Sequence, residues 1–115
     1  MRVKSWLGSE NRGYFWIYSE SNNDIGYVRF DALDDPKLFE ISILIDGQMR
    51  GRGLGKMMLE DSINRFALKN EGNLLRAVVH SSNLPSLRLF LLSGFNEVKS
   101  SDQWFELVLN LQEVR

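Results

Sequence analysis

The chain of 115 residues and 13.3 kDa has room for one domain, and we expect residues 1–115 to form it. Its composition, with 43% hydrophobic and 25% charged residues, excludes a disordered or collagenous chain and indicates a globular protein with a core. The formal net charge of -1 provides no overall positive field, so we expect neither nucleic acid nor a membrane surface as a partner.

The chain has no cysteine and one histidine, His80. A disulfide framework, a thiolate nucleophile, a zinc finger and an iron–sulfur site are therefore excluded, and we expect no metal site. The sequence also lacks an apolar run of the length of a signal peptide or of a membrane span, which needs about 20 residues. These features favour a soluble, cytoplasmic protein.

Strand patterns fill the first part of the chain. Residues 14–18 are almost all aromatic or β-branched, and residues 25–33 follow after a turn-rich stretch, which together predict a hairpin. A third candidate strand, residues 39–45, alternates between two faces. One face carries Phe39, Ile41, Ile43 and Ile45, and the other carries Glu40, Ser42 and Leu44. We expect this strand to be central in the sheet.

Helical spacing begins at residue 53 and continues to residue 70. Two apolar stripes run along this segment, from which we expect a helix wedged between two layers. A short apolar run at residues 74–79 predicts a fourth strand.

A second helix is predicted next, with Pro85 in its first turn and Gly94 at its end. We expect its buried stripe to consist of Leu84, Leu87 and Leu91. Residues 95–99 and 103–111, separated by a turn, predict a closing pair of strands.

The most informative stretch is QMRGRGLGK, residues 48–56, between the third candidate strand and the first helix. Its glycines free the backbone for positive φ and for close approach to a ligand. The N–H groups of the first turn of the helix favour an anion. Further positive charge comes from Arg50, Arg52 and Lys56. The stretch therefore predicts a phosphate or pyrophosphate site.

Two common phosphate-binding motifs do not fit this stretch. A P-loop would need glycine at position 50, where Arg50 stands, and Ser or Thr at position 57, where Met57 stands. A dinucleotide fingerprint needs G-x-G-x-x-G after the first strand of a βαβ unit, whereas the glycines here are spaced G-x-G-x-G after a third strand. A glycine-rich turn with solvated arginines is one alternative. An RNA-binding Arg-Gly segment is another, which the net charge disfavours.

Arg50, Gly53 and Gly55 match the pattern R/Q-x-x-G-x-G/A, and a second block matches N-x-x-S-x-x-L-Y-x-x-x-G-F with Phe90 in place of the tyrosine. The second block consists of Asn83, Ser86, Leu89, Phe90, Gly94 and Phe95. With both motifs in order, the chain from about Tyr14 to its C-terminus resembles the GNAT superfamily of acetyltransferases. The resemblance implies a mixed α/β single domain with a central, mostly antiparallel mixed sheet flanked by helices.

Members of this family usually open with a strand and two helices that build much of the acceptor site. Residues 1–13 are too few to supply these elements. We therefore expect a form of the fold that is truncated at the N-terminus. A second copy in a homodimer would then be one way to complete the acceptor site. Trp6, Tyr14, Trp16 and Tyr18 are candidate lining residues of the remaining pocket, and their alternative role is in the core.

The resemblance implies acetyl-CoA as the co-substrate. The strand at residues 39–45 would bind the pantetheine arm through its backbone, with Ile43, Leu44 and Ile45 nearest the thioester. The loop that would bind the pyrophosphate consists of Arg50, Gly51, Arg52, Gly53, Leu54, Gly55 and Lys56. Asn83 would contact the cofactor, and an N-cap is the alternative role of this residue.

The reaction that the resemblance implies is direct attack of a neutral amine on the thioester, with a strand N–H stabilising the oxyanion. Glu40 is the first candidate for the general base and His80 the second, and for each the alternative is an ordinary structural residue. Phe90 cannot protonate the departing thiolate as the tyrosine of the family pattern does. Water, or Ser86 one helical turn before Phe90, could take the place of the tyrosine as the proton donor.

We therefore expect an N-acetyltransferase that acts on a primary amine of a small molecule, for example an amino sugar, or of a protein. The alternative is a protein that binds acetyl-CoA without transferring the acetyl group, as a sensor or as a subunit of an assembly. The replacement of the tyrosine by Phe90 and the short N-terminal part motivate this alternative.

Overall fold

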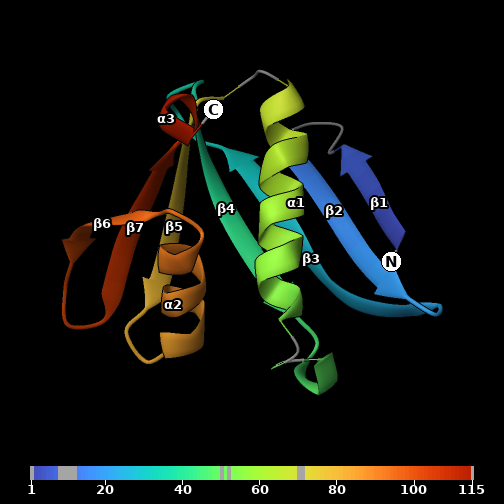
Figure 1. Cartoon of the computed structure of the whole chain (residues 1–115). Helices are drawn as coiled ribbons and strands as arrows, with labels where there is room; N and C mark the ends of the chain where they lie inside the picture. Colours follow the sequence, from blue (N-terminus) through green and yellow to red (C-terminus); the bar gives the residue numbers. More distant parts are fainter. Residues whose placement is uncertain (1, 8–12, 50, 52, 70–71, 115) are drawn as a thin grey trace.

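The computed structural model describes residues 2–7, 13–49, 51, 53–69 and 72–114. A seven-stranded sheet runs through the protein in the order β1-β2-β3-β4-β5-β7-β6, and helices α1 and α2 lie on one of its faces (Figure 1). The strands are β1 (Arg2–Leu7), β2 (Gly13–Glu20), β3 (Asn23–Ala32), β4 (Leu38–Ile45), β5 (Leu74–His80), β6 (Asn96–Ser100) and β7 (Trp104–Asn110). The helices are α1 (Leu54–Lys69) and α2 (Leu84–Leu92), with the short helices η1 (Gly47–Met49) and α3 (Leu111–Val114).

The strand pairing confirms the expected mixed and mostly antiparallel sheet. Neighbouring strands pair antiparallel throughout, except for β4 and β5, which are parallel. The six strands that the sequence predicts correspond to β2 through β7, and the two long helices also lie where we expect them. None of the helices in the described residues is long and apolar enough to cross a membrane.

The structure contains a strand, β1, that the sequence did not predict. It pairs antiparallel with β2, from Arg2 opposite Ser19 to Leu7 opposite Tyr14. It is an edge strand, and Lys4 and Ser5 interrupt its apolar residues, so its six residues carry a weak strand pattern. A first strand, which the sequence-based expectation did not include, is therefore present.

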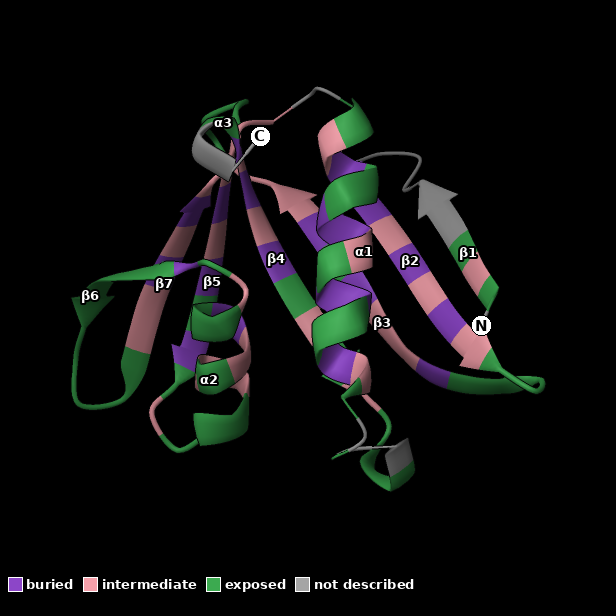
Figure 2. Cartoon of the chain, viewed as in Figure 1, coloured by how far each residue is buried: buried purple, intermediate pink, exposed green. Residues whose placement is uncertain are grey.

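Helix α1 packs on β2, β3 and β4 through one face. Its buried residues are Gly55, Met58, Leu59, Ser62, Ile63 and Phe66. The ring of Phe66 stacks on Phe30 with 4.6 Å between centroids and meets Phe39 edge-on at 4.8 Å. The outer side of the helix is exposed, as Figure 2 shows, and Met57 is part of it. The expectation of a helix wedged between two layers is therefore wrong.

Helix α2 packs on the half of the sheet that contains β5. Phe90 is buried and its ring meets that of Phe95 at 5.0 Å. Leu84 and Leu91 are 53% and 46% exposed, so the expected stripe of three leucines is wrong for these two, whereas Leu87 is partly buried. The ring of Phe90 buries more apolar area than a leucine, which favours the orientation that places it in the core.

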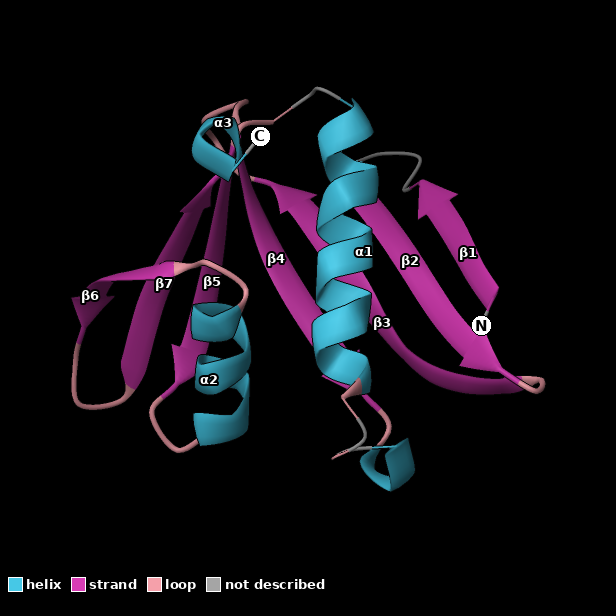
Figure 3. Cartoon of the chain, viewed as in Figure 1, coloured by secondary structure: helices cyan, strands magenta, loops and turns pink. Residues whose placement is uncertain are grey.

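Side chains of β2 alternate between the two faces of the sheet. Tyr14, Trp16 and Tyr18 are buried on the face that carries α1, which confirms their alternative interpretation as core residues. The side chain of Trp6 lies outside the described part of the structure. Phe15 and Ile17 point to the opposite face, which no helix of the described residues covers. We call this opposite side of the sheet the open face (Figure 3 views the sheet from the helix side).

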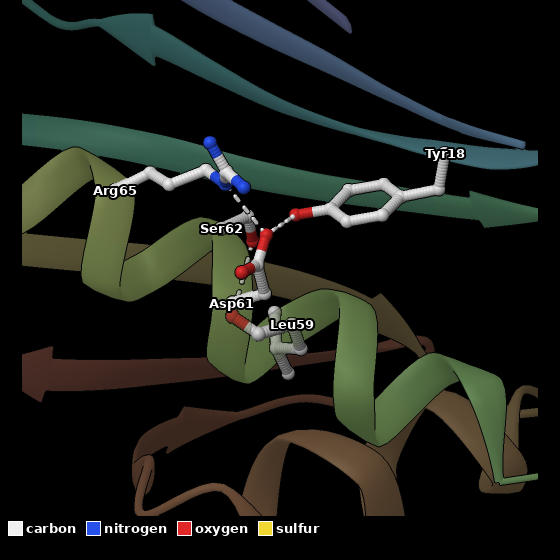
Figure 4. Close-up of polar contacts among 5 residues, drawn as sticks. All are labelled: Tyr18, Leu59, Asp61, Ser62 and Arg65. Atoms are coloured by element: carbon white, nitrogen blue, oxygen red, sulfur yellow. Dashed lines mark hydrogen bonds and ion pairs between the residues drawn. The ribbon is translucent and has the colours of Figure 1, made fainter. Parts of the chain in front are cut away.

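A polar contact fixes α1 on β2. The hydroxyl of buried Tyr18 donates to Asp61 Oδ2 at 2.7 Å, and Arg65 Nε donates to the same oxygen at 2.7 Å (Figure 4). Burial first, and then the hydrogen bond to Asp61, raise the pKa of Tyr18 well above its ordinary value, so this hydroxyl stays protonated. The contact satisfies a polar group that would otherwise be desolvated without a partner.

We expect Tyr18→Phe to lower the free energy of unfolding by about 1 kcal/mol, because one hydrogen bond of a largely buried hydroxyl is lost. Urea unfolding measures this change. Tyr27→Phe is the matched control, since the Tyr27 hydroxyl makes no hydrogen bond to another described residue. Equal stabilities of the two variants would show that the contact between Tyr18 and Asp61 contributes nothing.

Candidate active site

Strands β4 and β5 pair over a short distance and then separate. Their parallel pairing joins Leu38 to Leu74, Phe39 to Leu75 and Glu40 to Arg76. Beyond Glu40 and Arg76 the two strands no longer pair, and they diverge toward their carboxyl ends (Figure 1). We call the gap between residues 41–45 of β4 and residues 77–80 of β5 the strand opening.

The backbone of β4 presents alternate residues to the strand opening. Asp46 N–H donates to Ile25 C=O at 2.7 Å, and Leu33 N–H donates to Leu38 C=O at 3.0 Å. Because hydrogen-bonded pairs recur at every second position of an antiparallel ladder, the even-numbered residues of β4 bond to β3. Beyond the last parallel pair, Ile43 and Ile45 therefore present their backbone N–H and C=O groups to the opening.

The same reasoning holds for β5. Ser81 N–H donates to Gln103 C=O at 2.8 Å, so the odd-numbered residues of β5 bond to β7. Val78 and His80 accordingly present their backbone groups to the opening from the other side. A strand opening thus has two rows of backbone donors and acceptors that lack a partner strand. Such groups need a hydrogen-bonding partner, which water or a ligand with amide groups supplies.

Two helix N-termini lie at the wide end of the opening. Helices α1 and α2 both begin at the end of the sheet where β4 and β5 finish (Figure 1). Neither helix has an acidic residue in its first turn. No carboxylate in the first turn of either helix therefore neutralises the positive end of its dipole. This favours binding of an anion near the two N-termini.

The loop before α1 adopts the backbone conformations that its glycines allow. Gly51 and Gly53 have φ values of 79° and 72°. A side chain at either position would meet no atom within 4 Å, so the requirement for glycine comes from the backbone angle. Arg50 and Arg52, which the sequence also assigns to this site, lie outside the described residues.

Gly55 has a different role, because it lets three elements approach one another. A Cβ at this position would lie 2.7 Å from Ile45 Cδ1 and 3.2 Å from Leu89 Cδ2. The first turn of α1 thus lies directly against the end of β4 and against α2. Its neighbour Leu54 is partly buried against the core, whereas Lys56 is exposed, with its Nζ 3.9 Å from Glu60.

The second motif lies in α2. Asn83 caps this helix: its Oδ1 accepts a hydrogen bond from the Ser86 N–H at 3.3 Å, which confirms its alternative role as an N-cap. The side chain of Ser86 is half-buried, one turn before Phe90. Because Phe90 is 3% exposed and packs on Phe95, the structure places its ring in the core.

Glu40 lies at the closed end of the strand opening, on the open face. Its cross-strand neighbours are Asp31 on β3 and Arg76 on β5. Asp31 pairs with Arg29 at 2.8 Å, and Arg76 Nε lies 2.9 Å from Glu106 Oε1, an ion pair whose N–H is not aligned for a hydrogen bond. Among the described residues Glu40 itself has no ion-pair or hydrogen-bond partner on its carboxylate.

His80, the second candidate base, is already hydrogen-bonded. Its Nδ1 accepts from the Ser82 N–H at 3.1 Å and lies 2.7 Å from Ser82 Oγ, while its ring meets Trp104 edge-on. A neutral imidazole whose Nδ1 accepts a hydrogen bond carries its proton on Nε2, so its lone pair is engaged by the backbone. The lone pair of His80 is therefore occupied, whereas the carboxylate of Glu40 has no such partner among the described residues.

Two hollows flank the strand opening on the open face, and sequence reasoning missed both. The first, which we call the acidic hollow, has a volume of about 230 Å³, and its lining includes Phe15, Ile17, Tyr27, Leu44, Asp24 and Asp46. The second, the basic hollow, has a volume of about 340 Å³ and includes Arg76, Val78, Lys99, Trp104, Phe105 and Glu106. The sequence carried one signal for the acidic hollow. Side chains of residues 14–18 alternate between the two faces of a strand, which places Phe15 and Ile17 on the face opposite to the core residues.

The chain belongs to the acetyltransferase (GNAT) family, whose model matches residues 1–95. An N-acetyltransferase 9-like protein of Nematostella vectensis is 34% identical over 119 residues, which cover 92% of this chain and 60% of that protein. The chain therefore spans less than two thirds of this relative's length.

Solved structures of the family share the fold. A GNAT-family acetyltransferase of Streptococcus pneumoniae matches with a TM-score of 0.81 and 16% identity over 90% of this chain and 69% of its own. The N-acetyltransferase PseH of Campylobacter jejuni, solved in complex with acetyl coenzyme A, matches with a TM-score of 0.70 and 20% identity. These alignments cover 85% of this chain and 67% of PseH.

We expect Gly26→Ala to destabilise the protein by about 2 kcal/mol. Gly26 lies opposite Ile45, and a Cβ there would overlap the backbone oxygen of Leu44, which cannot move without disrupting the pairing of β3 and β4. Urea unfolding measures the change. Gly47→Ala is the control, because a Cβ at Gly47 meets no atom within 4 Å. A Gly26→Ala variant as stable as Gly47→Ala would contradict this account of the end of β4.

Proposed function

We propose that this protein transfers the acetyl group of acetyl-CoA to a primary amine of a small molecule. The observation that carries the proposal is the strand opening, whose unpartnered backbone groups end at a glycine loop and two helix N-termini. A ligand that fits this arrangement has amide groups along its length and a phosphate group at one end. The pantetheine pyrophosphate of CoA has both features.

The residues of the site suit acetyl-CoA part by part. Ile43 and Ile45 would hydrogen-bond the amides of the pantetheine arm, with Val78 opposite them on β5. The N–H groups of Gly51, Gly53 and the first turn of α1 would bind the pyrophosphate, together with the charges of Arg50, Arg52 and Lys56. Acetyl-CoA supplies an acetyl group activated as a thioester.

A backbone N–H of β4 would stabilise the oxyanion that forms when an amine attacks. The ladder makes Ile43 or Ile45 the donor, because the N–H of Leu44 faces β3. Leu44 would contact the ligand through its side chain, which is 50% exposed on the open face. The backbone of β4 therefore binds the thioester, and its side chains face the acceptor.

Glu40 would take the proton that the attacking amine loses. It precedes Ile43 by three positions, which is about 10 Å along a strand, so the proton would pass along a chain of several waters. The thiolate of CoA then leaves, and a thiol with an ordinary pKa near about 8.5 leaves tolerably without an acid. Phe90 cannot protonate it, so water or the Ser86 hydroxyl would do so.

We expect Gly53→Ala to weaken acetyl-CoA binding about fivefold. An alanine pays roughly 1 kcal/mol to adopt the positive φ of Gly53, although its methyl group would meet no neighbour. Calorimetry with acetyl-CoA measures the dissociation constant. Gly47→Ala should leave it unchanged, because Gly47 lacks a positive φ.

The outcome for the wild-type protein tests the binding half of the proposal. No heat of binding at millimolar acetyl-CoA would exclude the proposed cofactor. Equal dissociation constants for Gly53→Ala and Gly47→Ala would remove the loop from the site.

We expect Glu40→Gln to lower kcat at least about 100-fold without changing the dissociation constant of acetyl-CoA, since a general base contributes to turnover and not to cofactor binding. Release of CoA in the presence of an amine measures kcat. Asp31→Asn is the matched control: it neutralises the carboxylate directly across the ladder from Glu40 on the same face.

Unchanged turnover of Glu40→Gln would remove this residue as the base, and an equal loss in Asp31→Asn would indicate an effect of charge alone. Tight binding of acetyl-CoA by the wild-type protein, with no CoA release from any amine, would instead support a protein that binds the cofactor without transferring the acetyl group.

A further inference from the structure

The two hollows on the open face differ in charge, and this difference decides which of them suits an amine. The acidic hollow has Asp24 and Asp46 in its lining, whereas the basic hollow has Arg76 and Lys99, with Glu106 paired to the arginine. A protonated amine is attracted to the first and repelled from the cations of the second.

The carboxylates of the acidic hollow are available to a cation. Asp46 Oδ1 accepts a hydrogen bond from the Gln48 N–H at 2.9 Å, and both aspartates are exposed. Within the described part of the chain neither carboxylate is ion-paired. Both groups lie near the turn ends of their strands, so they form one edge of the hollow.

The walls of the acidic hollow are apolar and partly aromatic. The rings of Phe15 and Tyr27 lie 4.9 Å apart between centroids at an interplanar angle of 35°. Ile17 and Leu44 complete the wall, and Leu44 is half-exposed. A volume of about 230 Å³ is below the roughly 300–1,000 Å³ of sites for drug-sized ligands, so the hollow fits one ring or a short branched chain.

Leu44 connects this hollow to the strand opening. Its side chain lines the hollow, and its neighbours Ile43 and Ile45 present their backbone groups to the opening. The hollow and the opening thus lie on either side of one strand, and strands in a sheet are about 4.8 Å apart. A short amine in the hollow can therefore reach a thioester in the opening.

We infer that the acidic hollow binds the acceptor, and that the acceptor is a primary amine on a small aromatic or branched aliphatic body. This inference rests on the proposed function. Asp24 and Asp46 attract the ammonium form, while Phe15 and Tyr27 pack on the apolar body.

After loss of one proton the amine nitrogen attacks the thioester carbon, the C–N bond forms, and the C–S bond breaks. The second proton passes to Glu40 and the electron pair leaves with the CoA thiolate.

The test compares three amines by the release of CoA: 2-phenylethylamine, spermidine and glucosamine. We expect kcat/KM to be about tenfold higher for 2-phenylethylamine than for the other two, because its ring buries apolar area against the wall. Spermidine has an unbranched chain with further charges, and glucosamine has hydroxyl groups that would lose their hydration in the hollow.

Substitutions in the acidic hollow distinguish the contribution of its charge to acceptor binding from that of its apolar wall. Asp24→Asn should raise KM for 2-phenylethylamine about threefold at low salt, and this increase should shrink in about 0.5 M salt. Tyr27→Ala should raise the same KM about tenfold, since part of the aromatic wall is lost. Lys99→Ala in the basic hollow is the control, and its KM should not rise. Calorimetry with acetyl-CoA checks that each variant is folded.

The outcomes distinguish the inference from the proposed function. Higher kcat/KM for spermidine or glucosamine would overturn the inference and leave the proposed function standing. So would an unchanged KM in Asp24→Asn, which changes an exposed side chain and is not expected to impair folding. No CoA release from 2-phenylethylamine, with intact acetyl-CoA binding, would overturn the inference, and the absence of release from every amine of a wider panel would overturn the proposed function as well.

Discussion

The site depends on a parallel strand pairing that stops after three residue pairs. At the closed end β4 and β5 are firmly joined, since the N–H groups of Asn73 and Leu74 both donate to Lys37 C=O, at 3.1 and 3.2 Å. Gly72 lies against the rings of Phe39 and Phe66, where a Cβ would come within 2.6 Å of Phe39 Cδ1. The core is therefore continuous at this end, and the backbone groups that stay free lie at the other.

Each half of the sheet has its own helix: α1 contacts β2, β3 and β4, and α2 contacts β5. Helix α1 is held on β2, β3 and β4 by the stack of Phe66 on Phe30 and by the bond of Tyr18 to Asp61. Helix α2 is held on the β5 half by Phe90. The two helices meet at Gly55, where the missing side chain lets α1 approach Leu89. The two helices thus touch at this one point, above strands that are separated.

Local patterns predicted most of the elements, because alternation in residues 14–18 and 39–45 and the glycine run before α1 are properties of short segments. The same patterns could not orient α2, in which most positions are apolar and several faces satisfy the pattern equally. Tertiary packing chose the face with Phe90. β1 was missed because an edge strand needs no strict alternation.

The site was predicted in part for the same physical reason. The glycine loop and the N-cap at Asn83 are local, and their positions follow from sequence. The strand opening and the two hollows depend on how strands distant in sequence pair, so no segment carries a signal for them. Even the direction of the backbone groups of β4 is fixed by its register with β3 and not by β4 itself.

The burial of Phe90 and the exposure of the open face both affect how the leaving group of the proposed reaction would be protonated. With this ring packed in the core, the chain has no phenol at this position, and in the proposed reaction water or the Ser86 hydroxyl would protonate the departing thiolate. Leu44 is half-exposed and Glu40 is half-buried on a face that no described helix covers, so water can reach both of the side chains that the proposed reaction would use. Water also weakens electrostatic stabilisation of the oxyanion, because the local dielectric constant rises. In the proposed reaction, the rate at such an exposed site would therefore depend on positioning by the backbone of β4 more than on buried charges.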